Sequence, residues 1–151
     1  MNITLEKLLS LEPSIEAPLA NGRIKLVRHA MRGDLWKGFN KILRFDKDVL
    51  AAFTAEQGDD IFRDFDLILV FVPFAGGKAL LCGSFWNKGV CKPTVVTKTQ
   101  GYKKVLAFRD AKKNPQMRPE KDIIFSNLIY CAQLADLNDR LVIDWGGAAI
   151  S

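Results

Sequence analysis

The sequence contains little of what metal centres and imidazole-based catalysis require. His29 is the one histidine among the 151 residues, so sites that need two or three imidazoles are excluded, as is any Ser-His-Asp triad that does not use it. A single histidine in a basic strand is more typical of a structural or phosphate-facing role than of catalysis. The cysteines, Cys82, Cys91 and Cys131, are odd in number and lack the Cys-x-x-Cys spacing of zinc and redox sites. We therefore expect reduced, buried thiols, with no bound metal and no cofactor.

Long apolar runs, a targeting segment and a complete phosphate loop are also missing. No window approaches the roughly 20 apolar residues of a membrane span, and residues 1–7 show no basic region followed by an apolar stretch. Gly76, Gly77 and Lys78 resemble part of a phosphate loop, but Val72 holds the place of its first glycine. These absences predict a cytoplasmic protein that does not cross a membrane and does not hydrolyse nucleotides.

Two apolar runs around a glycine pair organise the chain. Residues 67–72 are apolar at six successive positions, and a second apolar run occupies residues 79–86. Between them, Pro73 lacks an amide proton and Gly76 and Gly77 tolerate positive φ, so we expect the strand pairing to stop there. The pattern predicts a β-hairpin that is covered on both faces, within a closed or nearly closed sheet.

The remaining patterns predict short helices and further strands within one domain spanning residues 1–151. Asp34 and Asp46 stand at candidate helix N-caps, and Val49, Leu50 and Phe53 form the apolar stripe of the second of these helices. An amphipathic helix is expected at residues 5–11, strands are expected at residues 24–29, 90–96, 123–134 and 140–145, a solvated acidic connection at 56–66, and irregular structure towards residue 121. The fold class is therefore α+β, with a mixed sheet flanked by short helices.

Positive charge accompanies aromatic side chains along the chain. The net charge is +5 and the sequence pI is about 9.2, and the basic excess is largest in residues 98–121. Basic side chains attract phosphates whatever the base sequence, and an aromatic face can stack on an unpaired base for about 1–3 kcal/mol. The interleaved residues are Lys25, Arg28, Arg32 and Lys37 around Trp36, Lys88 after Trp86, and Lys103 and Lys104 after Tyr102. Trp36 and Trp86 have an alternative role as ordinary core residues.

A second group of candidate site residues ends the last expected strand. Asp144, Trp145, Gly146 and Gly147 place a hydrogen-bond acceptor, an aromatic ring and two small residues side by side. A carboxylate can accept from an exocyclic amine such as cytosine N4, and glycines allow a ligand to approach the backbone. The alternative is a strand-ending aspartate beside a packed indole.

Four segments together resemble a known family. Arg-Ile-Lys-Leu-Val-Arg-His from residue 23, Asp-Leu-Ile-Leu-Val-Phe-Val-Pro from residue 66, Ala-Leu-Leu-Cys-Gly-Ser-Phe from residue 79 and Arg-Leu-Val-Ile-Asp-Trp-Gly from residue 140 resemble the domain that precedes GIY-YIG nuclease modules in some bacterial proteins. The expected strand order also resembles the PUA-like barrels, which include readers of modified bases. The resemblance implies a mixed, partly open β-barrel, and a targeting module whose cleavage is done by a separate, covalently linked domain. No GIY-YIG segment is present in these 151 residues.

The sequence thus predicts a nucleic-acid recognition domain that is not itself an enzyme, has no catalytic residue, and reads a modified or flipped base, in DNA rather than RNA. The expected backbone contacts are Arg28, Arg32, Lys103 and Lys104, and the expected stacking and pocket residues are Trp36, Trp86, Asp144 and Trp145. The alternative is a protein-interaction or small-ligand module. A magnesium-dependent nuclease that uses the acidic residues 56–66 is disfavoured, because those residues lie in a polar connection.

Overall fold

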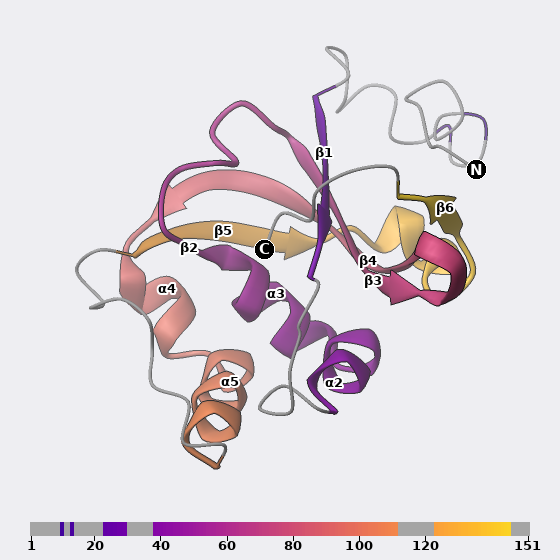
Figure 1. The fold of residues 1–151 in the computed structure, drawn as a ribbon. Helices are drawn as coiled ribbons and strands as arrows, with labels where there is room; N and C mark the ends of the chain where they lie inside the picture. Colours follow the sequence, from indigo (N-terminus) through magenta and orange to yellow (C-terminus); the bar gives the residue numbers. More distant parts are fainter. Residues whose placement is uncertain (1–9, 11–12, 14–22, 30–37, 112–122, 146–151) are drawn as a thin grey trace.

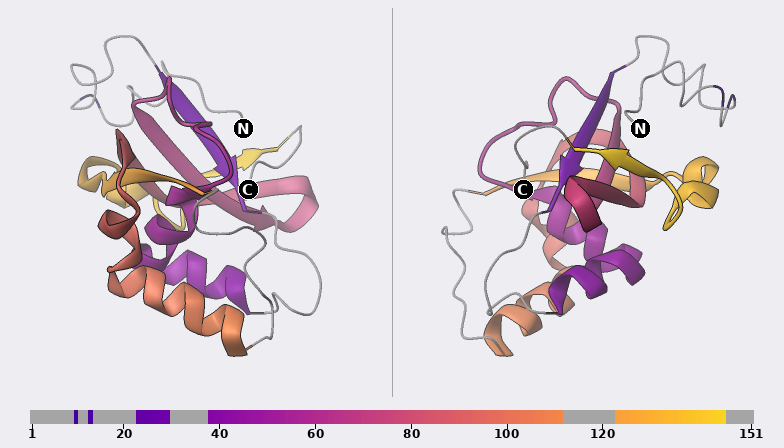
Figure 2. Two further views of the ribbon diagram at one scale, coloured as in Figure 1. Left: turned by 90° about the vertical axis from the view of Figure 1, so that its left-hand side faces the viewer. Right: turned by 45° about the vertical axis from the view of Figure 1, so that its right-hand side comes forward.

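A curled, open mixed sheet with helices on one face forms the framework of the molecule (Figure 1). The computed structural model describes residues 10, 13, 23–29, 38–111 and 123–145. The sheet forms a half-barrel, as the further views in Figure 2 also show. The predicted α+β class with a partly open barrel is confirmed.

The central hairpin is confirmed. It consists of β3 (Leu67–Phe74) and β4 (Lys78–Cys91), joined by a 3-10 turn, Ala75–Gly77. All six residues of 67–72 are buried, and both turn glycines take positive φ, 71° at Gly76 and 74° at Gly77. The pairing continues past Pro73, however, because Pro73 faces Ala79 and Phe74 faces Lys78. The glycines, rather than the proline, end the hairpin.

The long strand β4 connects the two halves of the sheet. One edge of β4 pairs with β3, which in turn pairs in parallel with β1 (Ile24–Arg28). Residues of β4 also pair with β6 (Val142–Asp144) and β5 (Ile124–Tyr130), and the two-residue strand β2 (Glu56–Gln57) lies beyond β5. Register shifts interrupt β3 after Val70 and β4 after Asn87. Irregularities of this kind bend strands, which helps the sheet to curl.

Helices α2 (Phe39–Phe45), α3 (Lys47–Ala55), α4 (Pro93–Thr97) and α5 (Gln100–Ala111) lie against one face of the sheet (Figure 1). Asp46 caps α3, since one of its carboxylate oxygens accepts the backbone N–H groups of Asp48 and Val49 at 3.1 Å. Val49 and Leu50 are buried, and Phe53 is half-buried. The predicted cap and apolar stripe are therefore confirmed.

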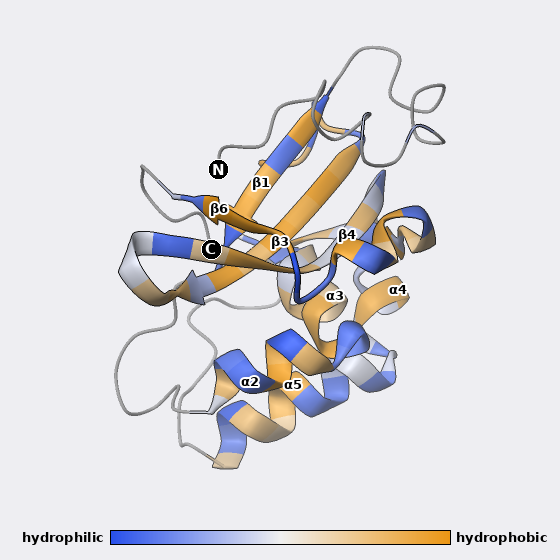
Figure 3. Cartoon of the chain, turned by 90° about the vertical axis from the view of Figure 1, so that its right-hand side faces the viewer, coloured by the Kyte–Doolittle hydropathy of each residue, from blue (hydrophilic) through white to orange (hydrophobic). Residues whose placement is uncertain are grey.

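Two apolar clusters share the sheet. On β3, Ile68, Val70 and Val72 belong to the cluster that packs against the helices, whereas Leu67, Leu69 and Phe71 belong to a second cluster with residues of β6 and of the 3-10 segment Ala132–Leu137. This alternation follows from the two-residue period of a strand. Figure 3 shows that β3 is coloured mostly as hydrophobic, as expected of a strand with an apolar cluster on each face. We call the first group the helix-side cluster and the second the barrel-side cluster.

Three expectations are wrong. Residues 90–96 do not form a strand, because β4 ends at Cys91 and Pro93 begins α4, where a missing N–H costs no helical hydrogen bond. The strand expected at 123–134 ends at Tyr130 and gives way to a 3-10 segment. The acidic connection is not wholly solvated, because the Glu56 side chain is only 10% exposed and pairs with Arg109.

Some expectations fall outside the described residues, namely the helix at 5–11, the cap at Asp34 and most of the irregular segment that follows α5. Within the described residues α2 begins at Phe39, after Gly38 with φ 87°. No helix in this described part of the chain has the length and apolar character needed to cross a membrane.

Candidate functional site

Arg28 and Trp145 meet at one end of the barrel-side cluster. The guanidinium carbon lies 5.4 Å from the centroid of the Trp145 indole, and that indole packs on Phe71 with a centroid distance of 5.8 Å. Strand pairing explains the meeting: Arg28 ends β1 beside Phe71 of β3, and the Trp145 amide donates to the Gly77 carbonyl at 3.2 Å. A cation over an indole contributes about 0.5–2 kcal/mol, depending on its desolvation.

No carboxylate in the described part of the chain pairs with Arg28. Its Nε is buried and has no hydrogen-bond partner among the described residues. By contrast, Arg23 donates to Asp66 at 2.8 and 2.9 Å, and Arg44 donates to Asp139 at 2.7 Å. Among the residues that the structure describes, no acidic side chain therefore neutralises the donors of the Arg28 guanidinium.

Asp144 lies next to Trp145 but is engaged by Lys78. Lys78 Nζ donates to Asp144 Oδ1 at 2.7 Å, across the first residue pair of β4 and β6. The hydrogen bond from Lys78, reinforced by its charge, holds the pKa of the Asp144 carboxyl below its usual value. An aspartate in this state is an ionised hydrogen-bond acceptor that is already occupied by Lys78.

Trp86 lies on the same face as Trp145 but at the other end of the cluster. It pairs with Leu67 of β3 and packs, half-buried, against the barrel-side cluster. Leu67 and Phe71 are four positions apart on β3, so the places where the two indoles meet this strand are about 13 Å apart. The contacts of Trp86 in the structure thus support its role as a core residue. Its role in stacking on a base stays a prediction.

Lys103 and Lys104 lie on the helical side of the sheet. Both are exposed on α5, and Lys104 Nζ pairs with Asp46 Oδ2 at 3.0 Å, so it supports the cap of α3. Arg28 follows Leu26 by two residues and shares its face, and Leu26 packs on the barrel-side cluster. The structure does not bring these cations into one cleft with Arg28. Arg32 and Trp36 lie outside the described residues.

His29 has a structural environment. Its ring is fully buried, Nε2 lies 2.8 Å from the Thr54 hydroxyl, and the ring meets Phe53 edge-on at 4.9 Å. Burial lowers the pKa of the imidazole to about 4. A neutral, buried imidazole offers no charge to a phosphate, which favours the structural role.

The described residues offer no metal site, and their cysteines are not activated as nucleophiles. No group of three His, Cys, Asp or Glu side chains within them could hold a metal ion. None of the three cysteines forms a disulfide, and burial raises the pKa of the Cys82 thiol to about 12. A thiol of this kind stays protonated and unreactive at neutral pH.

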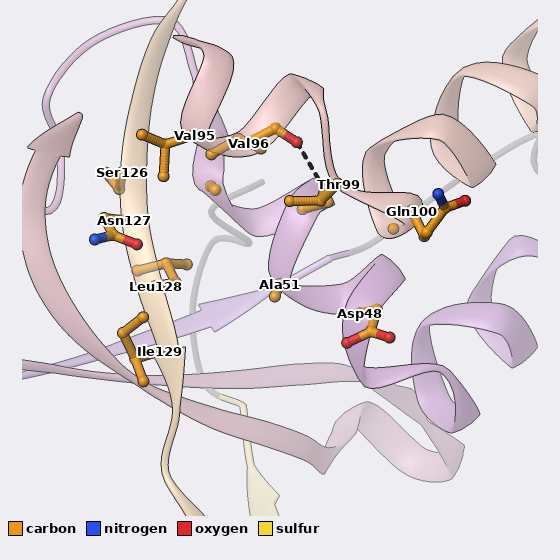
Figure 4. A pocket seen from close by; sticks show the side chains of 13 residues that line it. Asp48, Ala51, Val95, Val96, Thr99, Gln100, Ser126, Asn127, Leu128 and Ile129 are labelled. Carbon is orange, nitrogen blue, oxygen red and sulfur yellow. Dashed lines mark hydrogen bonds between the residues drawn. The ribbon is translucent and has the colours of Figure 1, made fainter. Parts of the chain in front are cut away.

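A pocket between α3, the junction of α4 and α5, and β5 was not predicted from the sequence (Figure 4). Its volume is about 460 Å³, and its walls include Ala51, Ala52 and Ala55 of α3, with Val96, Thr99 and Leu128 facing them. Gly101 also lines it, and a Cβ added there would lie 2.2 Å from the Asp48 carbonyl oxygen. The available signal was a run of small residues on one helix, which a sequence alone does not distinguish from ordinary helix packing.

The stretch between Asp66 and Asp110 carries basic residues but no acidic ones. Its cations are Lys78, Lys88, Lys92, Lys98, Lys103, Lys104 and Arg109. Of these, Lys92 and Lys98 flank α4 beside the pocket and have no carboxylate partner among the described residues. The pocket therefore has a positive margin at its α4 end.

No family model, curated protein or solved structure matches the chain.

Proposed function

We propose that this domain binds nucleic acid through the Arg28–Trp145 pair, with a phosphate on the guanidinium and an unstacked base against the indole. The observation that carries the proposal is a guanidinium that is stacked on an aromatic ring and has no carboxylate partner in the described part of the chain. A guanidinium in that position still presents paired N–H donors at its edge, and these match two phosphate oxygens.

The neighbouring residues fit this proposal. Asp144, beside Trp145, can accept from an exocyclic amine, and Trp86 at the other end of the barrel-side cluster is a second candidate for stacking. Flipping a base costs a few kcal/mol, least for weakened pairs, so discrimination among bases depends on contacts to the extruded base. We favour DNA over RNA and a targeting role for a covalently linked nuclease domain. Three cysteines that form no disulfide fit a cytoplasmic setting.

The test is fluorescence anisotropy with labelled 12-nucleotide single strands and with plain and cytosine-modified duplexes. Arg28→Ala should weaken binding about tenfold or more, and it should reduce the slope of log affinity against log salt by about 1, since one phosphate contact is lost. Arg28→Lys keeps the charge but loses the planar guanidinium, so its affinity should lie between those of the wild type and Arg28→Ala. Trp145→Phe should keep most of the stacking.

Lys41→Ala is the matched control, because it removes one exposed positive charge on α2 without touching Arg28. Equal affinities of the wild-type protein and Arg28→Ala, or a Lys41→Ala effect as large as that of Arg28→Ala, would contradict the proposed site. Binding that does not change with salt would contradict nucleic-acid binding by charge altogether.

A further inference from the structure

Strand β5 has an edge that no described strand covers along most of its length. Its partner β2 pairs only with Ile124 and Phe125, whereas β4 pairs with the opposite edge of β5 as far as Tyr130. Alternate residues of an antiparallel strand turn their N–H and C=O groups towards each edge. From Ser126 to Tyr130 this edge is therefore a template for one more strand.

The pocket lies directly beside this open edge. Leu128 extends from β5 towards Ala51 of α3, and Val95 and Val96 of α4 line the end of the pocket that is uppermost in Figure 4. Val95 is 47% exposed and Ile129 is 46% exposed, so apolar surface continues from the pocket along the strand. A strand added at this edge would place its alternate side chains over the alanine-lined pocket.

The charges around the pocket select the partner. Lys92 and Lys98 flank α4, and Cys91 pairs with Phe125, so Lys92 lies close to the start of β5. Asp48, at the N-terminal end of α3, is the one carboxylate among the pocket residues that the structure describes. The α4 end is thus positive and favours carboxylates on a bound segment.

We infer that this edge groove binds an extended segment of a partner protein, which adds a strand to β5, inserts an apolar side chain into the alanine-lined pocket and places carboxylates against Lys92 and Lys98. A single-stranded nucleic acid suits the groove less well. The described pocket residues include no aromatic ring on which a base could stack, and a sugar-phosphate backbone does not reproduce the alternating donors and acceptors of a strand.

The experiment uses three labelled, acetylated ten-residue probe peptides and the full chain. One peptide alternates glutamate and valine, one alternates lysine and valine, and one is the glutamate peptide with N-methylated alternate amides. The glutamate peptide should bind, the lysine peptide should bind at least tenfold more weakly, and N-methylation should abolish binding. Amide resonances of residues 126–130 should shift, and their hydrogen exchange should slow, when the glutamate peptide is added.

Two variants test the two contacts. Lys92→Glu with Lys98→Glu should weaken binding of the glutamate peptide at least tenfold, and Ala51→Leu should do the same by filling the pocket. Lys41→Glu with Lys103→Glu changes the net charge equally at positions that do not line the pocket and should leave binding within twofold. Circular dichroism and thermal unfolding verify that each variant is folded.

Several results would overturn the inference. These are binding of neither charged peptide, equal binding of both, or no change with Lys92→Glu, Lys98→Glu and Ala51→Leu. Shifts of residues 126–130 caused by a 12-nucleotide strand that displaces the peptide would assign the groove to nucleic acid instead. If these amides are protected from hydrogen exchange without any peptide, and the protection disappears on dilution, the groove binds a second copy of the chain.

Discussion

His29 shows what burial does to a single titratable group in this chain. Its folded-state pKa is about 4, below the ordinary histidine value of 6.5, because burial disfavours the charged imidazolium. Between pH 6.5 and pH 4 the unfolded chain binds a proton that the folded chain does not bind. The free energy of unfolding is therefore fully retained above pH 6.5 and decreases as the pH falls through this window.

We expect the wild-type protein to lose about 2–3 kcal/mol of unfolding free energy between pH 7.5 and pH 4.5 through this one group. Urea unfolding at the two pH values measures the loss, and in His29→Gln the same comparison should give a much smaller difference. The carboxyl groups with lowered pKa values, Asp46 and Asp144, stay ionised down to pH 4.5 and do not contribute. Equal pH dependence in the wild type and His29→Gln would contradict the assignment.

Between elements, the pair of Arg109 and Glu56 joins α5 to β2. Arg109 Nη1 lies 3.1 and 3.2 Å from the two carboxylate oxygens of Glu56, and the side chains are 14% and 10% exposed. Arg109 also lies over the Phe53 ring at 6.0 Å. A pair removed from water in this way is costly to break on one side only, because the remaining charge stays buried.

Arg109→Met should therefore lower the unfolding free energy by about 3–5 kcal/mol, and adding Glu56→Gln should restore part of that loss. Urea unfolding of the single and double variants measures the coupling. Arg63→Met is the control: Arg63 pairs with Asp60, but its side chain is 73% exposed, so its loss should cost less than about 1 kcal/mol. Similar losses for the two single variants would show that burial does not strengthen the first pair.

The helices and strands that were predicted correctly depend on residues close together in the sequence. The hairpin follows from six consecutive apolar residues and two glycines, and the α3 cap follows from Asp46, whose carboxylate reaches N–H groups only two and three residues away. Glu56 was misassigned because its partner lies on α5. The α4 segment was misassigned because valines that favour strands also fit a short helix after a proline.

The residues of the candidate site were named from the sequence, but their arrangement in space was not predicted. Arg28 and Trp145 are far apart in the sequence, and their contact depends on the parallel pairing of β1 with β3 and on the pairing of β6 with β4. Lys103 and Lys104 were grouped with them by charge, but the packing of α5 on α3 places these lysines on the opposite side of the sheet. Charge composition does not contain that information.

For the whole molecule, the two apolar clusters depend on one sheet. Consecutive residues of β3 alternate between the helix-side and barrel-side clusters, so loss of either cluster exposes one face of the same strands. We therefore expect the domain to unfold as one cooperative unit.

Leu50→Ala in the helix-side cluster and Leu69→Ala in the barrel-side cluster should each lower the unfolding free energy by about 2–5 kcal/mol, since both side chains are fully buried. Differential scanning calorimetry should show a single transition in each variant, with calorimetric and van't Hoff enthalpies that agree. Two separate transitions in either variant would show that the layers unfold independently.

Gly101 fixes the width of the pocket beside β5. Even a methyl group at this position would collide with the main chain of Asp48, so the first turns of α3 and α5 are in backbone contact. The two helices therefore cannot move closer together around a small ligand. The distance between the pocket walls is therefore fixed, and the pocket would select among inserted side chains by how completely each one fills it.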